Sequence, residues 1–328
     1  MKKMKILVTG GAGYIGSHVA NLFANRGYDV VVVDNLIYNQ KPPKINCKFY
    51  KEDICCKKSI SKIFESEKID AVAHLAALIE VGESISKPQI FYKTNLAGTI
   101  NLLDCMLEHN VNKIIFSSTC AIYGEPESVP MDENHAKNPA SPYAKSKLSI
   151  EYILEDYARA YGLKHVILRY FNVAGASPEI GLGENHIPET HLIPRLIRAI
   201  KNGDVCQIFG SDYATPDGTC VRDYLHVKDV AKAHIPALKY LNDNGAPTAL
   251  NLGTGNGFSV REIIFALEQL MNLKAKISIQ PRRCGDTPIL VCDGKKSKQV
   301  LGWEPTNSSL KNILQSAVEW EKQKALNL

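Results

Sequence analysis

The sequence predicts an α/β protein in which a doubly wound parallel sheet carries a smaller C-terminal α/β lobe. Short apolar segments rich in β-branched residues recur along the first half of the chain, and helical segments alternate with them. Strands that alternate with helices join into parallel sheets. The length of 328 residues adds a third observation, because it corresponds to about two domains of roughly 150 residues each.

The first half supplies the strands that are expected to build this sheet, at 5–9, 29–34, 48–50, 70–75, 113–118 and 164–169. Helices are expected at 14–26 and 143–161. After residue 172 the alternation loosens, with loops at 175–189 and 209–219, helices at 191–201, 260–271 and 310–324, and strands at 249–252 and 275–279. We therefore expect a sheet domain over 1–175, which about 224–241 rejoins, and a lobe over 176–328.

Composition excludes several classes of protein. The 39 Lys and Arg against 34 Asp and Glu leave a charge of +5 without any basic run, which argues against a nucleic-acid partner. The N-terminus carries only a four-residue apolar run, and no apolar stretch reaches 18 residues, so a cytoplasmic location without membrane contact is expected. The nine cysteines contain no CxxC and the nine histidines no HxxxH, which predicts reduced thiols and no metal site.

A glycine-rich turn separates the first strand from the first helix. Gly11, Gly13 and Gly16 fit GxGxxG, and Gly10, Gly13 and Gly16 fit GxxGxxG. Glycines let backbone N–H groups approach a pyrophosphate. Asp34 ends the second strand, where a carboxylate accepts hydrogen bonds from ribose hydroxyls and repels a 2′-phosphate, which favours NAD over NADP. The alternative is a tight turn and a surface aspartate. A Rossmann-type site is predicted, with Gly10, Gly13, Tyr14, Ile15, Gly16 and Asp34 binding the cofactor.

A second pattern concerns Tyr143 and Lys147, which are four residues apart and so share one face of the helix. A free tyrosine has a pKa of about 10. A lysine about 5 Å away contributes roughly 3 kcal/mol at an effective dielectric near 20, and a cationic nicotinamide nearby would add to that effect. Together they predict a phenolate poised near neutral pH. An exposed helix face is the alternative. The strand end with Ser118 and Thr119 favours catalysis, because it places hydroxyls at the carboxyl edge of the sheet.

On these residues the chain resembles the extended short-chain dehydrogenase/reductase family, and within it the UDP-glucose 4-epimerases. The resemblance covers essentially the whole chain. It is carried by ordered blocks that include VTGGAGYIGSH (8–18), HLAAL (74–78), IIFSSTCAIYGEP (114–126), SPYAKSKLSIE (141–151), LRYFNVAGA (168–176), GTCVRDYLHVKDVA (218–231) and RRCGDTP (282–288).

The resemblance implies reversible inversion at C4 of a UDP-sugar through a transient 4-keto sugar, with tightly held NAD. Tyr143 would act as the base, Lys147 would bind the nicotinamide ribose, and Thr119 and Ser118 would hold and shape the sugar site. Further cofactor contacts are implied for Asn35, Asp53, Ile54, Leu75, Ala76, Ala77, Asn95, Tyr170 and Phe171. Contacts to the UDP moiety are implied for Asn172, His191, Leu192, Phe209, Arg222, Arg283 and Asp286. The family also implies a homodimer through helices that include 143–161.

Several positions depart from the pattern or separate the alternatives. Related dehydratases and decarboxylases carry an acid after the threonine, where this chain has Cys120, so simple inversion is favoured. Ile79 replaces a lysine that many of these epimerases place near the cofactor pyrophosphate, and His191 replaces an asparagine. Leu290 replaces a tyrosine that closes the sugar pocket, which predicts activity on UDP-GlcNAc and UDP-GalNAc as well as UDP-glucose and UDP-galactose. Another NAD-dependent nucleotide-sugar enzyme and a non-catalytic NAD-binding regulator are the alternatives.

Overall fold

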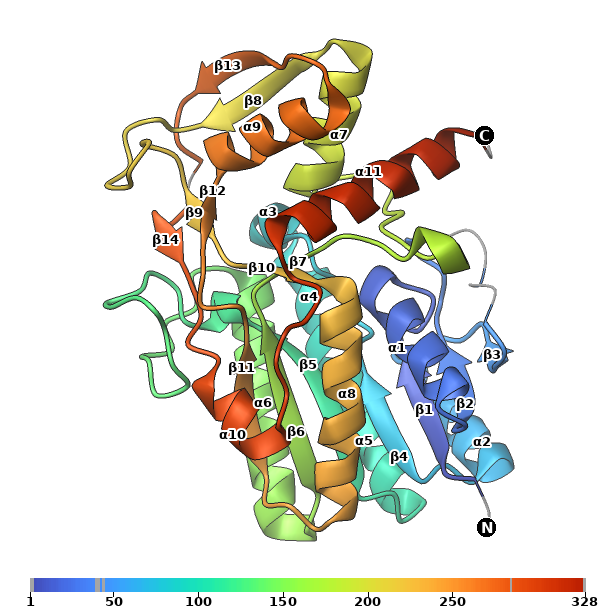
Figure 1. Ribbon diagram of the computed structural model, residues 1–328. Helices are drawn as coiled ribbons and strands as arrows, with labels where there is room; N and C mark the ends of the chain where they lie inside the picture. The colour runs from blue at the N-terminus through green and yellow to red at the C-terminus, as the bar shows by residue number, and fades with distance from the viewer. Residues whose placement is uncertain (1–2, 39–41, 43–44, 284, 327–328) are drawn as a thin grey trace.

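A computed structural model describes residues 3–38, 42, 45–283 and 285–326 (Figure 1). Within them, seven parallel strands form one sheet in the order β11-β6-β5-β4-β1-β2-β3. The chain runs from β1 toward β3 on one side of the sheet and then continues at β4 on the other side of β1. Such a reversal leaves a crevice at the carboxyl ends of β1 and β4. The bounds are β1 Lys5–Thr9, β2 Asp29–Val33, β3 Lys48–Tyr50, β4 Ala71–His74, β5 Lys113–Thr119, β6 Lys164–Tyr170 and β11 Thr248–Leu252.

Helices cover both faces of this sheet and create two cores. On one face lie α1 (Tyr14–Asn25) and α8 (Val227–Asn242), and on the other lie α2 (Lys57–Glu67), α5 (Gly98–Glu108) and α6 (Pro142–Tyr161). Along β2, Val30 and Val32 enter the first core, whereas Val31 and Val33 enter the second. This explains the continuous apolar run, because successive side chains of a strand point to opposite faces.

The smaller lobe lies beyond the carboxyl ends of the sheet strands, at the top of Figure 1. Its core joins α7 (Leu192–Asn202), α9 (Val260–Met271) and α11 (Leu310–Leu326) to the parallel pair of β8 (Val205–Phe209) and β13 (Lys276–Gln280). The remaining elements are α3 Val81–Ser86, α4 Pro88–Phe91, the π-helix η1 Tyr92–Ala97, the 3₁₀ turns η2 Cys120–Ile122 and η3 Pro178–Ile180, β7 Asn172–Ala174, β9 Val221–Arg222, β10 Tyr224–His226, β12 Phe258–Ser259, β14 Ile289–Leu290 and α10 Lys295–Leu301.

One predicted strand belongs elsewhere than expected. The strand at 249–252 is β11, which pairs with β6 at the edge of the large sheet and not with the lobe. The sequence placed it in the lobe because its partner lies some 80 residues upstream. We therefore propose that residues 224 to about 252 return to the sheet domain. The division between the two domains at residue 175 remains a prediction.

Helix α6 carries the Tyr143 and Lys147 pattern, and local signals fix where it starts and ends. The Ser141 hydroxyl accepts a hydrogen bond from the Ala144 N–H at 3.2 Å, and Pro142 occupies the first turn. The helix ends at Gly162, whose φ of +70° suits glycine. The N-terminal part of the helix lies beside the end of β5, where the Lys147 ammonium reaches the Ser117 carbonyl oxygen.

Two other expectations concern the whole chain. Among the described helices, none combines the length and the apolar character that a membrane crossing requires. The eight described cysteines are free thiols, and Cys284 lies outside the described residues.

Candidate active site

A cavity of about 480 Å³ lies at the carboxyl edge of the sheet and continues to the lobe. It brings together most of the residues that the sequence singled out, from the glycine turn to the tyrosine and lysine of α6. The predicted residues that line it are Gly10, Gly13, Tyr14, Ile15, Gly16, Asp34, Asn35, Asp53, Ile54, Leu75, Ala76, Ala77, Ser118, Thr119, Tyr143, Lys147, Tyr170, Phe171, Asn172, His191 and Leu192.

The glycine turn is packed so closely that side chains are excluded. Gly10 has a φ of +69°, and a Cβ on it would lie 2.6 Å from the backbone nitrogen of Ala76. A Cβ on Gly16 would lie 2.0 Å from the carbonyl oxygen of Gly10. Gly13 is the N-cap of α1, so the first N–H groups of this helix face the cavity edge. This cradle fits a dinucleotide pyrophosphate.

Asp34 and Asp53 lie at the end of the cavity where an adenosine ribose is expected. Burial raises the pKa of Asp34, while hydrogen bonds from backbone N–H groups, including those of Leu36 and Ala12, lower it. Burial raises the pKa of Asp53 too, but the Asn35 amide at 3.0 Å and the Cys55 N–H at 2.8 Å outweigh it and the pKa falls. Carboxylate acceptors therefore lie next to the turn, which fits ribose hydroxyls.

Asn95 departs from its predicted place. Its side chain is buried behind the cavity wall, where it accepts from the Leu78 N–H at 2.8 Å and donates to the Leu78 carbonyl oxygen and to the Ser146 hydroxyl. Asn95 thus holds the segment after β4 against α6. The motif could not distinguish a residue that touches the cofactor from one that supports the cavity wall.

We expect Gly16→Ala to reduce cofactor binding, because the new methyl group must displace the Gly10 carbonyl. Overpacking of this kind costs about 1–3 kcal/mol of stability. The NAD content of the purified protein, measured after denaturation, should fall well below that of the unmodified protein. Gly82→Ala is the matched control, since a Cβ there meets nothing within 4 Å. Equal NAD content in the two variants would contradict this role of the turn.

Tyr143, Thr119 and Lys147 meet at the end of β5. Thr119 and Tyr143 both line the cavity, and hydrogen bonding to Thr119 lowers the pKa of Tyr143. The Lys147 ammonium donates to the Ser117 carbonyl at 2.8 Å and lies 4.9 Å from the centre of the Phe116 ring. Thr119, Tyr143 and Lys147 therefore line the same cavity.

Burial dominates the electrostatics of Tyr143 and Lys147. Burial raises the pKa of Tyr143 to about 12, although the hydrogen bond with Thr119 lowers it. Burial also lowers the pKa of Lys147 to about 7, although the charge of Glu151 raises it. These are the effects of the protein's own side chains, whereas the prediction of a phenolate near neutral pH also counted a cationic nicotinamide beside the pair, so it stays a prediction. That prediction omitted desolvation, which disfavours both charged forms.

Ser118 faces away from the cavity into a buried network that sequence reasoning missed. Its hydroxyl donates to Glu151 at 2.5 Å, and Glu151 forms a two-point ion pair with Arg169, at 3.0 and 2.7 Å. Arg169 also donates to the Tyr123 hydroxyl at 2.9 Å. The signal in the sequence is an arginine inside the apolar strand 164–170. Ser118 supports the end of β5 and lines the cavity without presenting its hydroxyl to it.

The residues predicted for the UDP moiety fall into two groups. Asn172, His191 and Leu192 line the cavity. The others, Phe209, Arg222, Arg283, Asp286 and Leu290, form a cluster in the lobe beside it. There the Arg283 guanidinium lies 4.8 Å from the Phe209 ring centre and binds Asp286 at 2.9 Å. The Arg222 guanidinium lies 3.8 Å from the Asp286 carboxylate. Leu290 on β14 pairs with Arg222 on the neighbouring strand β9.

The chain is similar in sequence and structure to known proteins over most of its length. A profile of the NAD dependent epimerase/dehydratase family matches residues 6–253. The chain is 44% identical to the UDP-glucose 4-epimerase of Halalkalibacterium halodurans, over 98% of this chain and 96% of that one. The structure of UDP-glucose 4-epimerase from Brucella ovis in complex with NAD has a TM-score of 0.93 at 43% identity, and covers 96% of this chain and 97% of its own.

A structure of the UDP-Glc/GlcNAc 4-epimerase from Campylobacter jejuni has a TM-score of 0.83 at 41% identity, and covers 98% of this chain and 99% of its own. Both the sequence identity and the shared fold extend over nearly the full length. Together with the glycine turn, the cavity and the Tyr143 and Lys147 pair, these matches establish that the chain belongs to the NAD dependent epimerase/dehydratase family.

Proposed function

We propose that the protein is an isomerase that inverts C4 of UDP-sugars with tightly bound NAD, and that it interconverts UDP-glucose and UDP-galactose. One observation carries this proposal: a single cavity joins the glycine turn to Tyr143, Lys147 and Thr119. A cofactor whose pyrophosphate lies at the turn would extend along the cavity toward the phenol. The names of the relatives support the same reaction.

The residues fit NAD at each part of the cavity. The glycine turn excludes side chains, and the carboxylates of Asp34 and Asp53 would accept hydrogen bonds from ribose hydroxyls. Lys147 would donate to the hydroxyls of the nicotinamide ribose. NAD, when bound, supplies a hydride acceptor for C4 and a positive charge beside Tyr143.

The phenolate form of Tyr143 would take the proton of the sugar 4-hydroxyl and later return it. Thr119 would hydrogen-bond that hydroxyl and orient it toward the phenolate. Removing the proton while hydride leaves C4 gives a 4-keto sugar, which rotates and is reduced on its other face. The burial that raises the Tyr143 pKa also excludes water from the phenolate once it forms.

Elimination chemistry receives less support. In this cavity Cys120 follows Thr119, and burial raises the pKa of its thiol to about 12. A buried thiol of this kind replaces the carboxyl group that a dehydratase would use after the threonine. We therefore favour inversion over dehydration or decarboxylation.

The lobe would hold the UDP moiety, with residues 176–328 serving as the nucleotide-sugar domain. Arg222 and Arg283 suit a pyrophosphate, and Phe209 offers an apolar face for the base. Asp286 would accept from the ribose. These arginines now pair with Asp286 and would exchange that carboxylate for phosphate oxygens. Asn172, His191 and Leu192 would complete the contacts from the cavity side.

A cytoplasmic homodimer is part of the proposal. Tyr152 on α6 is half exposed, and Ile85 of α3 and Ile90 of α4, on elements that contact α6, are exposed too. Such apolar side chains on neighbouring helices suit an interface between two copies. Light scattering should give twice the chain mass of 36.3 kDa; a mass of one chain would contradict the dimer.

The proposed activity is tested by incubating the purified protein with each UDP-sugar and recording the anomeric NMR signals. We expect UDP-glucose and UDP-galactose to reach the same mixture from either side. A non-catalytic NAD-binding regulator would give no C4 epimer with any UDP-sugar, and that result would exclude the proposed function.

The acetylated pair, UDP-GlcNAc and UDP-GalNAc, is a second substrate class that Leu290 favours. Leu290 packs against a cluster that includes Phe171 and Cys120, which line the cavity, so its side chain would lie just behind the sugar end. We expect Leu290→Tyr to lower kcat/KM for UDP-GlcNAc selectively, by about 10-fold or more, since a bulkier ring fills the space for an acetamido group. Equal loss on UDP-glucose would contradict this role.

A further inference from the structure

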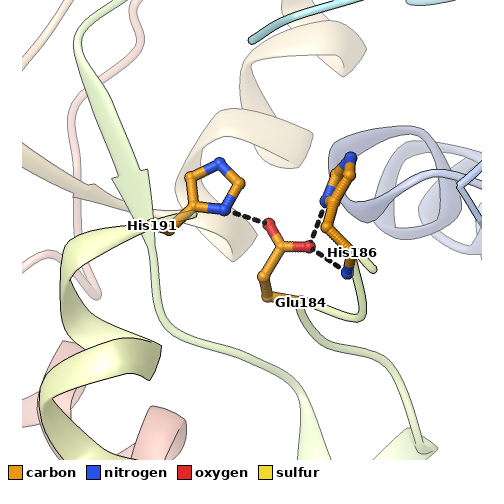
Figure 2. Close-up of side chains that lie close together, drawn as sticks. All are labelled: Glu184, His186 and His191. Carbon is orange, nitrogen blue, oxygen red and sulfur yellow. Dashed lines mark hydrogen bonds and ion pairs between the residues drawn. The ribbon is translucent and has the colours of Figure 1, made fainter. Parts of the chain in front are cut away.

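The loop between β7 and α7 gathers two histidines around one carboxylate. His186 and His191 approach Glu184 from opposite sides with their Nδ1 atoms (Figure 2). One oxygen of Glu184 accepts from the His186 ring and from the backbone N–H of His186, and the other lies 3.4 Å from His191 Nδ1. One ligand atom from each residue lies within 4.8 Å of the others.

Glu189 adds a second buried carboxylate to this cluster. Its Oε1 lies 2.8 Å from His191 Nδ1. The side chains of Glu184 and Glu189 are only 6% and 3% exposed, and the Oε2 atom of each is buried without a hydrogen-bond partner. The nearest arginine, Arg198, is 3.7 Å from Glu189. Buried carboxylate oxygens that lack donors are costly unless a cation compensates them.

Residues of α11 and α1 hold the loop that carries these side chains in place. The Trp320 ring N–H of α11 donates to the Glu184 carbonyl oxygen at 2.8 Å, and Lys324 donates to the same atom at 3.1 Å. A Cβ on Gly183 would lie 2.6 Å from the Trp320 ring. At the start of the loop, the Tyr14 hydroxyl donates to the Gly175 carbonyl at 2.6 Å. Ligands that are fixed in this way lose little freedom when an ion binds.

We propose that Glu184, His186 and His191 form a binding site for a divalent transition-metal ion of the Zn²⁺ class, with Glu189 as a neighbouring carboxylate next to His191. Two imidazole nitrogens and a carboxylate oxygen are a ligand set that Zn²⁺ prefers, at bond lengths of about 2.0–2.2 Å. A tetrahedral ion would separate these ligand atoms by about 3.4 Å, so small side-chain rotations suffice.

Charge and access both suit a metal ion. A doubly charged cation with two neutral histidines would neutralise the two buried carboxylates. The three ligands line the large cavity, so an ion has a path to them from its open side. The rival arrangement is that protons alone compensate the charge, with both histidines protonated and donating to the glutamates. In that case the cluster binds no metal ion, so a direct measurement of metal binding distinguishes the two arrangements.

The test starts from full-length protein that has been treated with a chelator and dialysed. Titration with Zn²⁺ in a calorimeter should show about one ion per chain at micromolar affinity or better. Co²⁺ in place of Zn²⁺ should give visible absorption bands of nitrogen and oxygen coordination. Glu184→Gln and His186→Gln should each weaken binding by more than the roughly 10- to 100-fold that loss of a partner behind a ligand costs, since each removes a ligand itself. His109→Gln, at the far end of α5, is the matched control and should bind as the unmodified protein does.

Thermal unfolding provides the second measurement. Zn²⁺ should raise the Tm of the unmodified protein and of His109→Gln, because a ligand of the folded state stabilises it, and should leave the Tm of the two ligand variants unchanged. If a ligand variant fails to fold, the Co²⁺ spectrum of the unmodified protein still decides the matter. The proposal is overturned if the unmodified protein binds no Zn²⁺ or Co²⁺, or if folded Glu184→Gln and His186→Gln bind with unchanged affinity. These readouts need no UDP-sugar, so they are independent of the proposed epimerase activity.

Discussion

Replacing Tyr143 with phenylalanine should lower kcat for UDP-glucose by about 10²- to 10⁴-fold, which is the usual contribution of a positioned acid or base. The variant keeps the ring that lines the cavity and loses only the hydroxyl that bonds to Thr119. Because Tyr143 is not needed to hold the pyrophosphate end, the NAD content of the purified variant should stay the same. Steady-state rates and NAD content of the denatured protein measure the two effects.

Tyr161→Phe is the matched control for this prediction. Tyr161 lies on the same helix, is exposed at the opposite end and should be replaceable without loss of rate. Activity retained by Tyr143→Phe would refute the assignment of the base. Loss of NAD together with activity would instead indicate that the ring positions the cofactor.

Glu151→Gln should lower the free energy of unfolding by about 3–5 kcal/mol, because it leaves the buried Arg169 charge without its partner. The side chains of Glu151 and Arg169 are 2% and 3% exposed, and they support Ser118 at the end of β5. The ion pair and the Tyr123 contact raise the pKa of Arg169, although burial lowers it, so the guanidinium stays charged. Urea unfolding followed by circular dichroism measures the change.

Two further variants test the cause of this loss. Glu155→Gln, one turn along on the exposed side of α6, should change stability by less than about 1 kcal/mol. The double variant Glu151→Leu and Arg169→Met should recover much of the loss, since it removes both buried charges. A Glu151→Gln variant as stable as Glu155→Gln would show that the network is not a buried support of the site.

Local patterns were sufficient to predict the part of the fold and site that depends on neighbouring residues. The strands β1 and β3, the helix α9 and the turn from Gly10 to Gly16 follow from alternation, caps and glycine spacing, and the structure has them where the sequence indicated. Tyr143 and Lys147 could be placed together because a four-residue spacing fixes one helical face.

Features that depend on distant residues could not be predicted in this way. The pairing of β11 with β6 and of Leu290 with Arg222 joins segments far apart in the chain, and no local pattern specifies it. The Ser118 hydroxyl donates to the same Glu151 oxygen that the Arg169 Nε–H binds, and both residues are remote from Glu151 in the chain. The pKa of Tyr143 rises because burial opposes ionisation, which spacing alone does not show.

The proposed inversion at C4 is tested most directly by following the hydrogen on that carbon. UDP-glucose that carries deuterium at C4 would be incubated with the purified protein in ordinary water, and the product examined by NMR. Hydride removal and return by one bound cofactor predict UDP-galactose that retains the deuterium at C4. UDP-galactose with hydrogen at C4, or no C4 epimer at all, would contradict the proposed chemistry.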